Sequence, residues 1–269
     1  MNSTAKAFTP NISGCLEDWL ESQIERHANY FHARPTLLDV GAYHGDFSRR
    51  FAGAPGGPFR EAILFEPNPD NFAVLQREFS SNKAFHLEPK ACGEGAGNAK
   101  LFCQGERYTG SLLAYENDRP GPKNEHSVTV TTVDEILSEG KYSQPVGIIK
   151  SDTQGNDLRV LKGAVKTLRN HRPWLVVEML ATPRFVNQAW PLEVTQFLAG
   201  EKYFLAAQFN EYYTATGWLA WYDACFVPLE LFSMEATSNY LRPTASETKA
   251  GRQSNRTLGQ KLGRVFKTA

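Results

Sequence analysis

Short apolar runs alternate along the chain with segments of helical spacing. The runs are typical of strands buried inside a parallel sheet, and the segments between them place apolar residues on one side of a helix. We predict strands at residues 36–40, 61–66, 84–88, 146–152 and 174–178, and helices at residues 15–31, 46–51, 69–79, 132–139, 158–168 and 192–198. This alternation predicts an α/β fold built on a mostly parallel sheet.

Two regions depart from the alternation. Residues 93–131 hold glycines and polar residues around short apolar runs at 99–104 and 127–132, which indicates an inserted, partly antiparallel excursion. Residues 203–208 and 218–227 are strands without a helix between them, which predicts a hairpin at the sheet edge.

The chain therefore divides into an N-terminal helical lead-in (1–35), one main domain (36–230) and a C-terminal tail (241–269). The tail carries seven basic residues and one acidic residue among Ser, Thr and Gly. Such a composition is typical of a mobile segment.

Composition narrows the class of protein. Lys+Arg and Asp+Glu are both 29, so no overall charge favours nucleic acid, and we expect no nucleic-acid partner. The four cysteines form no C-x-x-C pair, which argues against a zinc site or a disulfide framework and fits a reducing compartment. No apolar run reaches the roughly 18 residues of a membrane helix. We expect a soluble, cytoplasmic protein, with its oligomeric state open.

Glycines and a carboxylate follow the first two strands. Gly41 and Gly45 allow backbone N–H groups to approach an anionic group, and Glu66 is placed to accept the hydroxyls of a ribose. A dinucleotide fingerprint needs a third glycine, which is missing here. The pattern favours S-adenosylmethionine as cofactor; a nicotinamide-dependent oxidoreductase is the alternative.

Two further acids end neighbouring strands. Asp152 follows the fourth strand and Glu178 the fifth, so both can face one cleft, and we predict them as the catalytic residues, Asp152 first, as a base or an orienting group. The structural alternatives are a turn-capping Asp152 and a buried Glu178 paired with Lys150 or an arginine. Ser111, in the excursion, is a candidate for the acceptor pocket. No His/Asp cluster supports a metal site, and a metal held by Asp152 and Asp157 is left as an alternative.

Four motifs together resemble the FkbM family of S-adenosylmethionine-dependent methyltransferases. They are Asp39-Val-Gly-Ala-Tyr-His-Gly45, Phe65-Glu-Pro-Asn-Pro69, Ile149-Lys-Ser-Asp-Thr-Gln-Gly-Asn-Asp-Leu158 and Val176-Val-Glu178, within a similarity that runs from about residue 37 to about residue 228. The resemblance implies a class I methyltransferase, Rossmann-like fold: a seven-stranded, mostly parallel sheet with helices on both faces and an antiparallel last strand.

The resemblance also implies an activity and a set of cofactor-binding residues. The activity is in-line methyl transfer to a hydroxyl on a sugar, glycan or other small metabolite. The residues expected at the cofactor are Asp39, Gly41, Tyr43, Gly45, Glu66, Asn68 and Ala91.

Three positions depart from the family pattern. Tyr43 stands where Asn is usual, Asp157 where Glu is usual, and Ser151 where an apolar residue is common. Tyr43 leaves a second alternative open, a module that binds S-adenosylmethionine without catalysis.

Overall fold

The computed structural model describes residues 15–31, 34–52, 57–104, 109–116, 123–143 and 145–231. Residues Gly14–Leu229 form one compact unit. The basic tail at 241–269 and the first residues of the lead-in lie outside the described residues. No helix in the described ranges is both long enough and apolar enough to cross a membrane.

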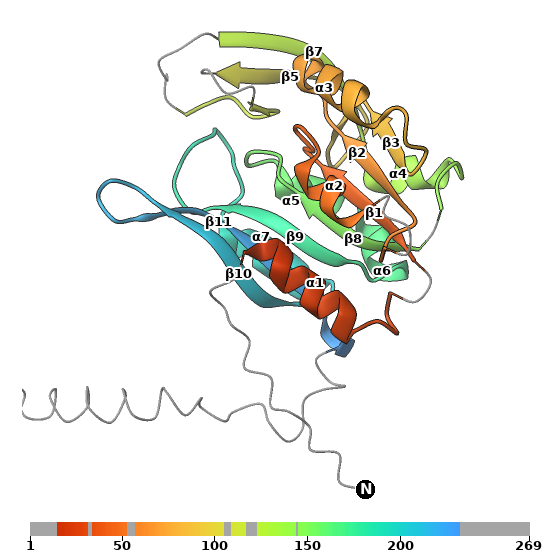
Figure 1. Cartoon of the computed structure of the whole chain (residues 1–269). Coiled ribbons are helices and arrows are strands. Elements are labelled where there is room, and N and C mark those ends of the chain that lie inside the picture. The colour runs from red at the N-terminus through yellow and green to blue at the C-terminus, as the bar shows by residue number, and fades with distance from the viewer. Residues whose placement is uncertain are drawn as a thin grey trace, which may run out of the picture. The chain divides into compact units, whose positions relative to one another are not determined.

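The centre of the structure is a sheet of seven strands in the order β10-β11-β9-β8-β1-β2-β3 (Figure 1). β11 runs antiparallel to both of its neighbours, β10 and β9, and all other neighbouring strands in this sheet are parallel. The sheet therefore confirms the seven strands, the antiparallel last strand and the late hairpin at the edge. The bounds are β1 Thr36–Val40, β2 Glu61–Phe65, β3 Phe85–Glu88, β8 Val146–Ser151, β9 Trp174–Leu180, β10 Tyr203–Tyr213 and β11 Leu219–Pro228.

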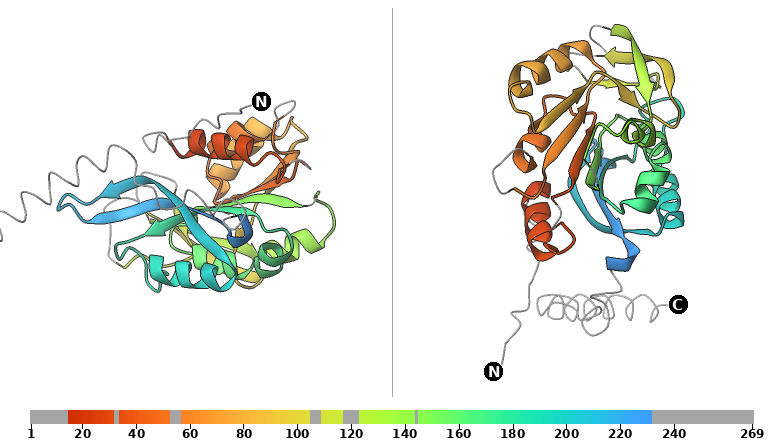
Figure 2. Two further views of the ribbon diagram at one scale, coloured as in Figure 1. Left: turned by 90° about the horizontal axis from the view of Figure 1, so that it is seen from below. Right: turned by 90° about the vertical axis from the view of Figure 1, so that its right-hand side faces the viewer.

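Helices cover both faces of this sheet, as Figure 2 shows. The first three helices lie on one face and the other four on the opposite face, so β1 and β9 are buried along their whole length. The helices are α1 Leu16–Arg26, α2 Asp46–Phe51, α3 Pro69–Phe79, α4 Val133–Ser138, α5 Asp157–Lys162, α6 Val165–Asn170 and α7 Pro191–Gly200.

Local capping explains where two helices begin. The Asn68 side chain accepts a hydrogen bond from Asp70 N (2.9 Å) with Pro69 in the first turn of α3, and Thr132 Oγ1 accepts one from Glu135 N (2.9 Å) at the start of α4. A side-chain acceptor satisfies an N–H that has no partner within the helix. Both starts agree with the sequence.

The prediction of a single helix at 158–168 is wrong, because the chain forms two short helices, α5 and α6, in this region. A Cβ at Gly163, which lies between them, would come within 2.0 Å of Gly93 O. The backbone of the excursion packs so closely there that the helix is interrupted.

The excursion forms a second sheet, in the order β4-β7-β5-β6. Its strands are β4 Ala91–Cys92, β5 Gly97–Gln104, β6 Gly110–Ser111 and β7 Lys123–Thr131, and β5 pairs antiparallel with both β6 and β7. Its own apolar cluster of Ala91, Leu101, Val128 and Val130 holds it together. Two of its three strand pairings are antiparallel, and it stands at the carboxyl ends of the main parallel strands, beside the candidate site.

Candidate functional site

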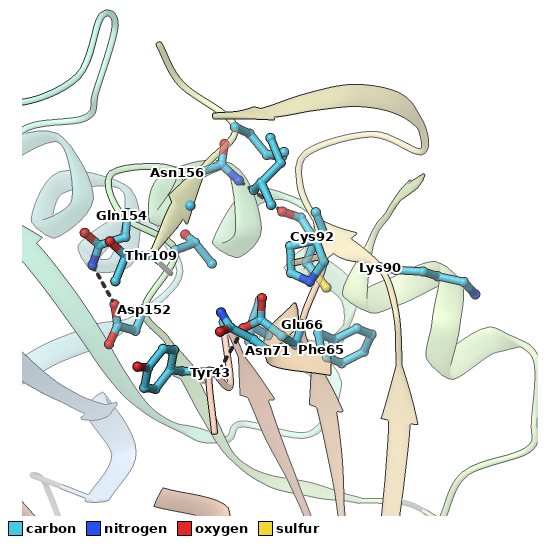
Figure 3. Close-up of a pocket in the computed structure, with 18 residues that line it drawn as sticks. Tyr43, Phe65, Glu66, Asn71, Lys90, Cys92, Thr109, Asp152, Gln154 and Asn156 are labelled. Atoms are coloured by element: carbon cyan, nitrogen blue, oxygen red, sulfur yellow. Dashed lines mark hydrogen bonds between the residues drawn. The ribbon is translucent and has the colours of Figure 1, made fainter. Parts of the chain in front are cut away.

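A pocket of about 380 Å³ lies beyond the carboxyl ends of β1, β2 and β8 (Figure 3). This is where ligands bind in open parallel sheets, and the volume is within the usual range for small-molecule sites, about 300–1,000 Å³. The excursion forms the far wall. The lining residues are Val40, Gly41, Tyr43, Phe65, Glu66, Pro67, Asn71, Lys90, Ala91, Cys92, Leu101, Thr109, Gly110, Leu112, Asp152, Thr153, Gln154 and Asn156.

The loop after β1 reaches the pocket through its backbone. Gly41 has φ +78°, and a Cβ there would lie 2.1 Å from Asp152 O, so only glycine allows the ends of β1 and β8 to come this close. Gly41 N and Ala42 N both donate to Phe65 O at 3.0 Å, which fixes the loop on β2.

Glu66 closes β2 and lies against the same loop. Glu66 is 5% exposed, and its two carboxylate oxygens accept hydrogen bonds from Tyr43 N (2.8 Å) and Asn68 N (2.9 Å). Burial raises the pKa of Glu66 to about 7, against the opposing effect of these two amides. The predicted ribose acceptor therefore lines the pocket as a carboxylate whose orientation the backbone sets.

Tyr43 takes part in this arrangement mainly through its backbone. Its N–H donates to Glu66, and its ring stacks on that of His44 with centroids 3.7 Å apart. The residue as a whole is 39% exposed. Its φ of +53° is unusual for a residue with a side chain. An asparagine, the usual family residue, adopts that conformation more readily.

Three of the predicted cofactor residues do not line the pocket. Asp39 is fully buried, accepts from Ser48 Oγ (2.7 Å) and lies 3.7 Å from Lys150 Nζ. Gly45 precedes α2 with φ +78°, where a Cβ would meet the ring of Phe79 at 2.5 Å. Asn68 caps α3. All three fix the loops around the pocket, whereas Ala91 lies on its wall.

On the other side of the pocket, carboxylates from three strands come together. Asp152 follows β8, Glu178 lies in β9, and Asp223 of β11 pairs directly with Glu178. Gln154 Nε2 donates to Asp152 Oδ1 (3.1 Å) and to both oxygens of Glu178 (3.0 Å). The two acids predicted to share a cleft are therefore joined by one amide, as Figure 3 shows for Asp152 and Gln154.

These acids differ in their surroundings. Asp152 lines the pocket with a side chain that is 37% exposed. Glu178 is 8% exposed, and burial, followed by the charges of Asp152 and Asp157, raises its pKa well above the ordinary value. Burial also raises the pKa of Asp223. A buried carboxylate beside other carboxylates holds its proton more tightly than one at the pocket surface.

Lys150 supplies the balancing positive charge, as expected for a lysine inside an apolar strand. Its Nζ lies 3.4 Å from Asp152 Oδ2 and 3.7 Å from Asp39 Oδ1. Burial alone lowers the pKa of this ammonium, but the carboxylates of Asp152, Asp39 and Asp223 outweigh burial and raise it. Lys150 thus links Asp39 in β1 to Asp152, the acid that follows β8.

Two of the departures from the family pattern touch each other. Ser151 Oγ donates to Asp157 Oδ1 (2.6 Å), and Thr153 N and Gly155 N donate to the same carboxylate. Since aspartate is one methylene shorter than glutamate, the hydroxyl of Ser151 gives this carboxylate a partner within its shorter reach.

Ser111 is not in the pocket wall. It is fully buried, donates to Gln154 O (2.7 Å) and accepts from Leu113 N (3.0 Å). Its hydroxyl ties the excursion to the loop after β8, so the expectation that it lines the acceptor pocket is corrected.

Three residues around the site were not predicted from sequence: Gln154, Asp223 and Asn71. Gln154 lies two positions after Asp152, so its place in the motif was a usable signal. Asn71 is 2% exposed and its side chain hydrogen-bonds Glu66. Asp223 had no local signal, because only strand pairing brings it opposite Glu178.

The donor set fits a nucleoside with an amino-acid end better than a metal. Gly41 provides a close backbone approach, Glu66 a buried acceptor, and Phe65, Leu101 and Leu112 apolar walls. Within the described residues, no group of three or more His, Cys, Asp or Glu side chains is arranged to hold a metal ion.

Residues 39–210 match the model of the methyltransferase FkbM domain. No curated protein matches the chain.

Among solved structures, a methyltransferase FkbM from Methylobacillus flagellatus KT is 18% identical with a TM-score of 0.46, over 71% of this chain and 43% of that one. The chain thus spans less than half the length of that protein. An rRNA methylase from Streptococcus thermophilus is 9% identical (TM-score 0.42; 77% and 96% covered). Magnesium protoporphyrin IX methyltransferase from Synechocystis PCC 6803, with bound SAM, is 6% identical (TM-score 0.41; 82% and 85% covered).

Proposed function

Because the chain belongs to the FkbM methyltransferase family, we propose that its pocket binds S-adenosylmethionine and that the protein methylates a hydroxyl oxygen of a sugar, glycan or other small metabolite. The observation that carries the proposal is the placement of Glu66 and Asp152 in one pocket, on either side of the Gly41 loop. In this proposal Glu66 would accept the ribose hydroxyls, and Asp152 would meet the acceptor hydroxyl.

The cofactor would be held mainly from the β1 and β2 side. Gly41 and Tyr43 would lie against the amino-acid end without offering their N–H groups, which already donate to Phe65 O and Glu66. Glu66 would accept the ribose hydroxyls, and Ala91 would contact the adenine. When bound, S-adenosylmethionine supplies a methyl group on a positively charged sulfur. The protein's own task is then to align the acceptor and to handle its proton.

Asp152 is our candidate for the base. Its side chain is 37% exposed against 8% for Glu178, and Gln154 and Lys150 hold its two oxygens at 3.1 and 3.4 Å. A fixed carboxylate at the pocket wall is suited to accept the proton of a hydroxyl as the oxygen is methylated.

Glu178 acts, in this proposal, as a positioning residue. Its raised pKa favours the protonated form, which is not a base, and its contact with the pocket runs through Gln154. Glu178 therefore orients the side-chain amide of Gln154, and this amide in turn orients Asp152.

The family assignment favours this function over a nicotinamide-dependent oxidoreductase, and the ordered base favours catalysis over a binding-only module. The balanced charge supports an acceptor other than nucleic acid. The four cysteines are free thiols, which supports a cytoplasmic location. We also propose that the chain divides into a lead-in (residues 1–35), a methyltransferase domain (36–230) and a basic tail (241–269).

The test is transfer of a labelled methyl group from S-adenosylmethionine to a panel of neutral sugars, glycans and hydroxylated metabolites. We expect label in at least one acceptor, with S-adenosylhomocysteine as the second product. Label in no acceptor, together with an NADH fluorescence change on mixing, would favour the oxidoreductase. Cofactor binding without label in any acceptor would favour the non-catalytic module.

A further inference from the structure

Outside the pocket, three exposed aromatic residues lie close together in the chain at the free end of the β10–β11 hairpin. Tyr212, Tyr213 and Trp218 are 52%, 58% and 72% exposed, and Trp218 is the most exposed large hydrophobic residue in the described part of the chain. Figure 1 shows this end of the hairpin projecting beyond the body of the sheet. Grouped, exposed aromatic residues are a mark of a binding surface.

The end of the hairpin is held by its own hydrogen bonds. Thr214 N donates to Trp218 O (2.7 Å), Trp218 N donates to Thr214 Oγ1 (3.0 Å), and Gly217 N donates to Thr214 O (2.9 Å). Gly217 has φ +84°, as a tight turn requires. Trp218 is thus presented on a defined turn.

The stem of the hairpin is packed against two other loops of the site. Tyr212 stacks on Trp221, with centroids 4.4 Å apart and planes 15° from parallel. Trp221 packs in turn on the cluster of Leu113, Leu180 and Phe185, which come from the excursion, β9 and the loop after β9. The stem of the hairpin therefore packs on the excursion, which also forms the far wall of the pocket.

The same strand leads from the aromatic residues to the acids. Trp221 pairs with Leu180, and two residues further Asp223 pairs with Glu178. Because side chains two apart in a strand share a face, Trp221 and Asp223 lie on one side of the sheet. Asp223 accepts from Asn210 (2.7 Å), and Gln154 connects Glu178 to Asp152.

Charge narrows the class of ligand. Residues 203–228, the whole hairpin, contain Glu211 and Asp223 but no lysine or arginine. A surface that binds nucleic acid or an anionic membrane needs basic residues to meet the phosphates. Arg184, from the loop after β9, lies over the ring of Trp221 at the stem, with its Cζ 6.0 Å from the ring centroid, so the described surface carries both signs of charge and no basic cluster. Such an aromatic surface suits a neutral ring with an apolar face and several hydroxyls, because the ring stacks while polar side chains accept and donate hydrogen bonds.

We propose that the β10–β11 hairpin is a binding site for a neutral oligosaccharide, with sugar rings on Tyr212, Tyr213 and Trp218 and the chain leading past Asp223 to Asp152. This proposal rests on the proposed function, since it takes the methylated hydroxyl to belong to that sugar chain. It selects a glycan over a small free metabolite as the acceptor.

The experiment measures binding of the labelled full chain, with S-adenosylhomocysteine present, to a printed array of neutral and acidic glycans. We expect binding to neutral glycans, weakened about tenfold by Trp218→Ala through loss of a stacked ring. Trp190→Ala is the matched control, because Trp190 is also exposed (43%) but precedes α7 outside the hairpin. Melting curves of both variants check that they fold.

Several outcomes would overturn the proposal. On the array, these are no bound glycan, a preference for acidic glycans, or equal binding by wild type and Trp218→Ala. Binding to phosphatidylglycerol vesicles or self-association that depends on Trp218, without glycan binding, would also overturn it. Calorimetry with S-adenosylmethionine separates the two proposals. Cofactor binding without glycan binding rejects the hairpin site alone, whereas glycan binding without cofactor binding rejects the proposed methyl transfer.

Discussion

The ends of β1 and β2 form what we call the cofactor side of the site, and the ends of β8, β9 and β11 form its acceptor side. On the cofactor side, backbone groups do most of the work: Gly41 allows the close approach, and the amides of Tyr43 and Asn68 fix Glu66. On the acceptor side, side chains hold one another, with Gln154 between Asp152 and Glu178 and Asp223 opposite Glu178.

The difference predicts that the two sides of the pocket tolerate substitution differently. A site made by a backbone turn tolerates few changes, because a side chain at Gly41 would enter the space of Asp152 O. A site made by side chains on several strands can be altered one residue at a time. The predictions below test whether the two sides are as separate as this comparison requires.

The largest effect is expected at Asp152, on the acceptor side. Asp152→Asn should reduce the rate of methyl transfer about 10²–10⁴-fold, because it removes the proposed base, and should leave cofactor affinity nearly unchanged. Single-turnover rates and calorimetry measure the two effects. Asp134→Asn is the control, since Asp134 is another carboxylate, which accepts from Lys166 N at the start of α6. An unchanged rate in Asp152→Asn would remove it from the mechanism.

On the cofactor side, Gly41→Ala should destabilise the fold by more than about 3 kcal/mol, because it combines a left-handed backbone with a contact to Asp152 O. Gly140→Ala isolates the backbone part: Gly140 has φ +73° but open space around it, so its cost should stay near 1–2 kcal/mol. Urea denaturation measures both. Equal costs would mean that the close approach of β1 and β8 has no energetic importance.

Glu66 should give the cofactor side a distinctive pH dependence. Its pKa is about 7 in the folded chain against an ordinary 4.5, so the folded state binds the proton more tightly. The free energy of unfolding should therefore fall by about 3 kcal/mol at most as the pH rises from about 4.5 to above 7. Denaturation of wild type and Glu66→Gln across this range measures the difference.

In Glu66→Gln the fall in the free energy of unfolding between about pH 4.5 and pH 7 should vanish, because glutamine does not titrate. Glu25→Gln, a change at an exposed position of α1, should keep the wild-type slope. The same slope in wild type and Glu66→Gln would contradict a buried carboxylate at the end of β2.

The smallest effect concerns the support of the acceptor side. Ser151→Ala should cost about 1–2 kcal/mol of stability, because the buried carboxylate of Asp157 loses one donor. Ser138→Ala, which removes a hydroxyl bonded to Glu135 O at an exposed helix end, should cost less. Urea midpoints compare the two. A Ser151→Ala variant as stable as wild type would show that the two departures from the family pattern are independent.

The two sides also differ in how much the sequence revealed. Gly41, Glu66 and the caps at Asn68 and Thr132 were predictable, because a turn, a strand end and a helix start depend on neighbouring residues. The seven-stranded sheet followed for the same reason.

Contacts between distant residues were not predictable in this way. The break at Gly163 depends on Gly93 O, 70 positions earlier, and Asp223 meets Glu178 only because β11 is inserted between β10 and β9. Asp39 and Gly45 belong to a motif that points to the cofactor, but one is buried beside Lys150 and the other packs on Phe79. A sequence motif marks the loop without separating the residues that line the pocket from those that support it.

The most direct test of the account is a calorimetric titration of S-adenosylmethionine into wild type and Glu66→Gln at a pH above 7. We predict saturable binding to wild type with about one molecule per chain, and affinity about 10–100-fold lower in Glu66→Gln, as for the loss of a charged hydrogen-bond partner. No heat of binding at millimolar cofactor, or equal affinity in the two proteins, would contradict the assignment of this pocket to S-adenosylmethionine.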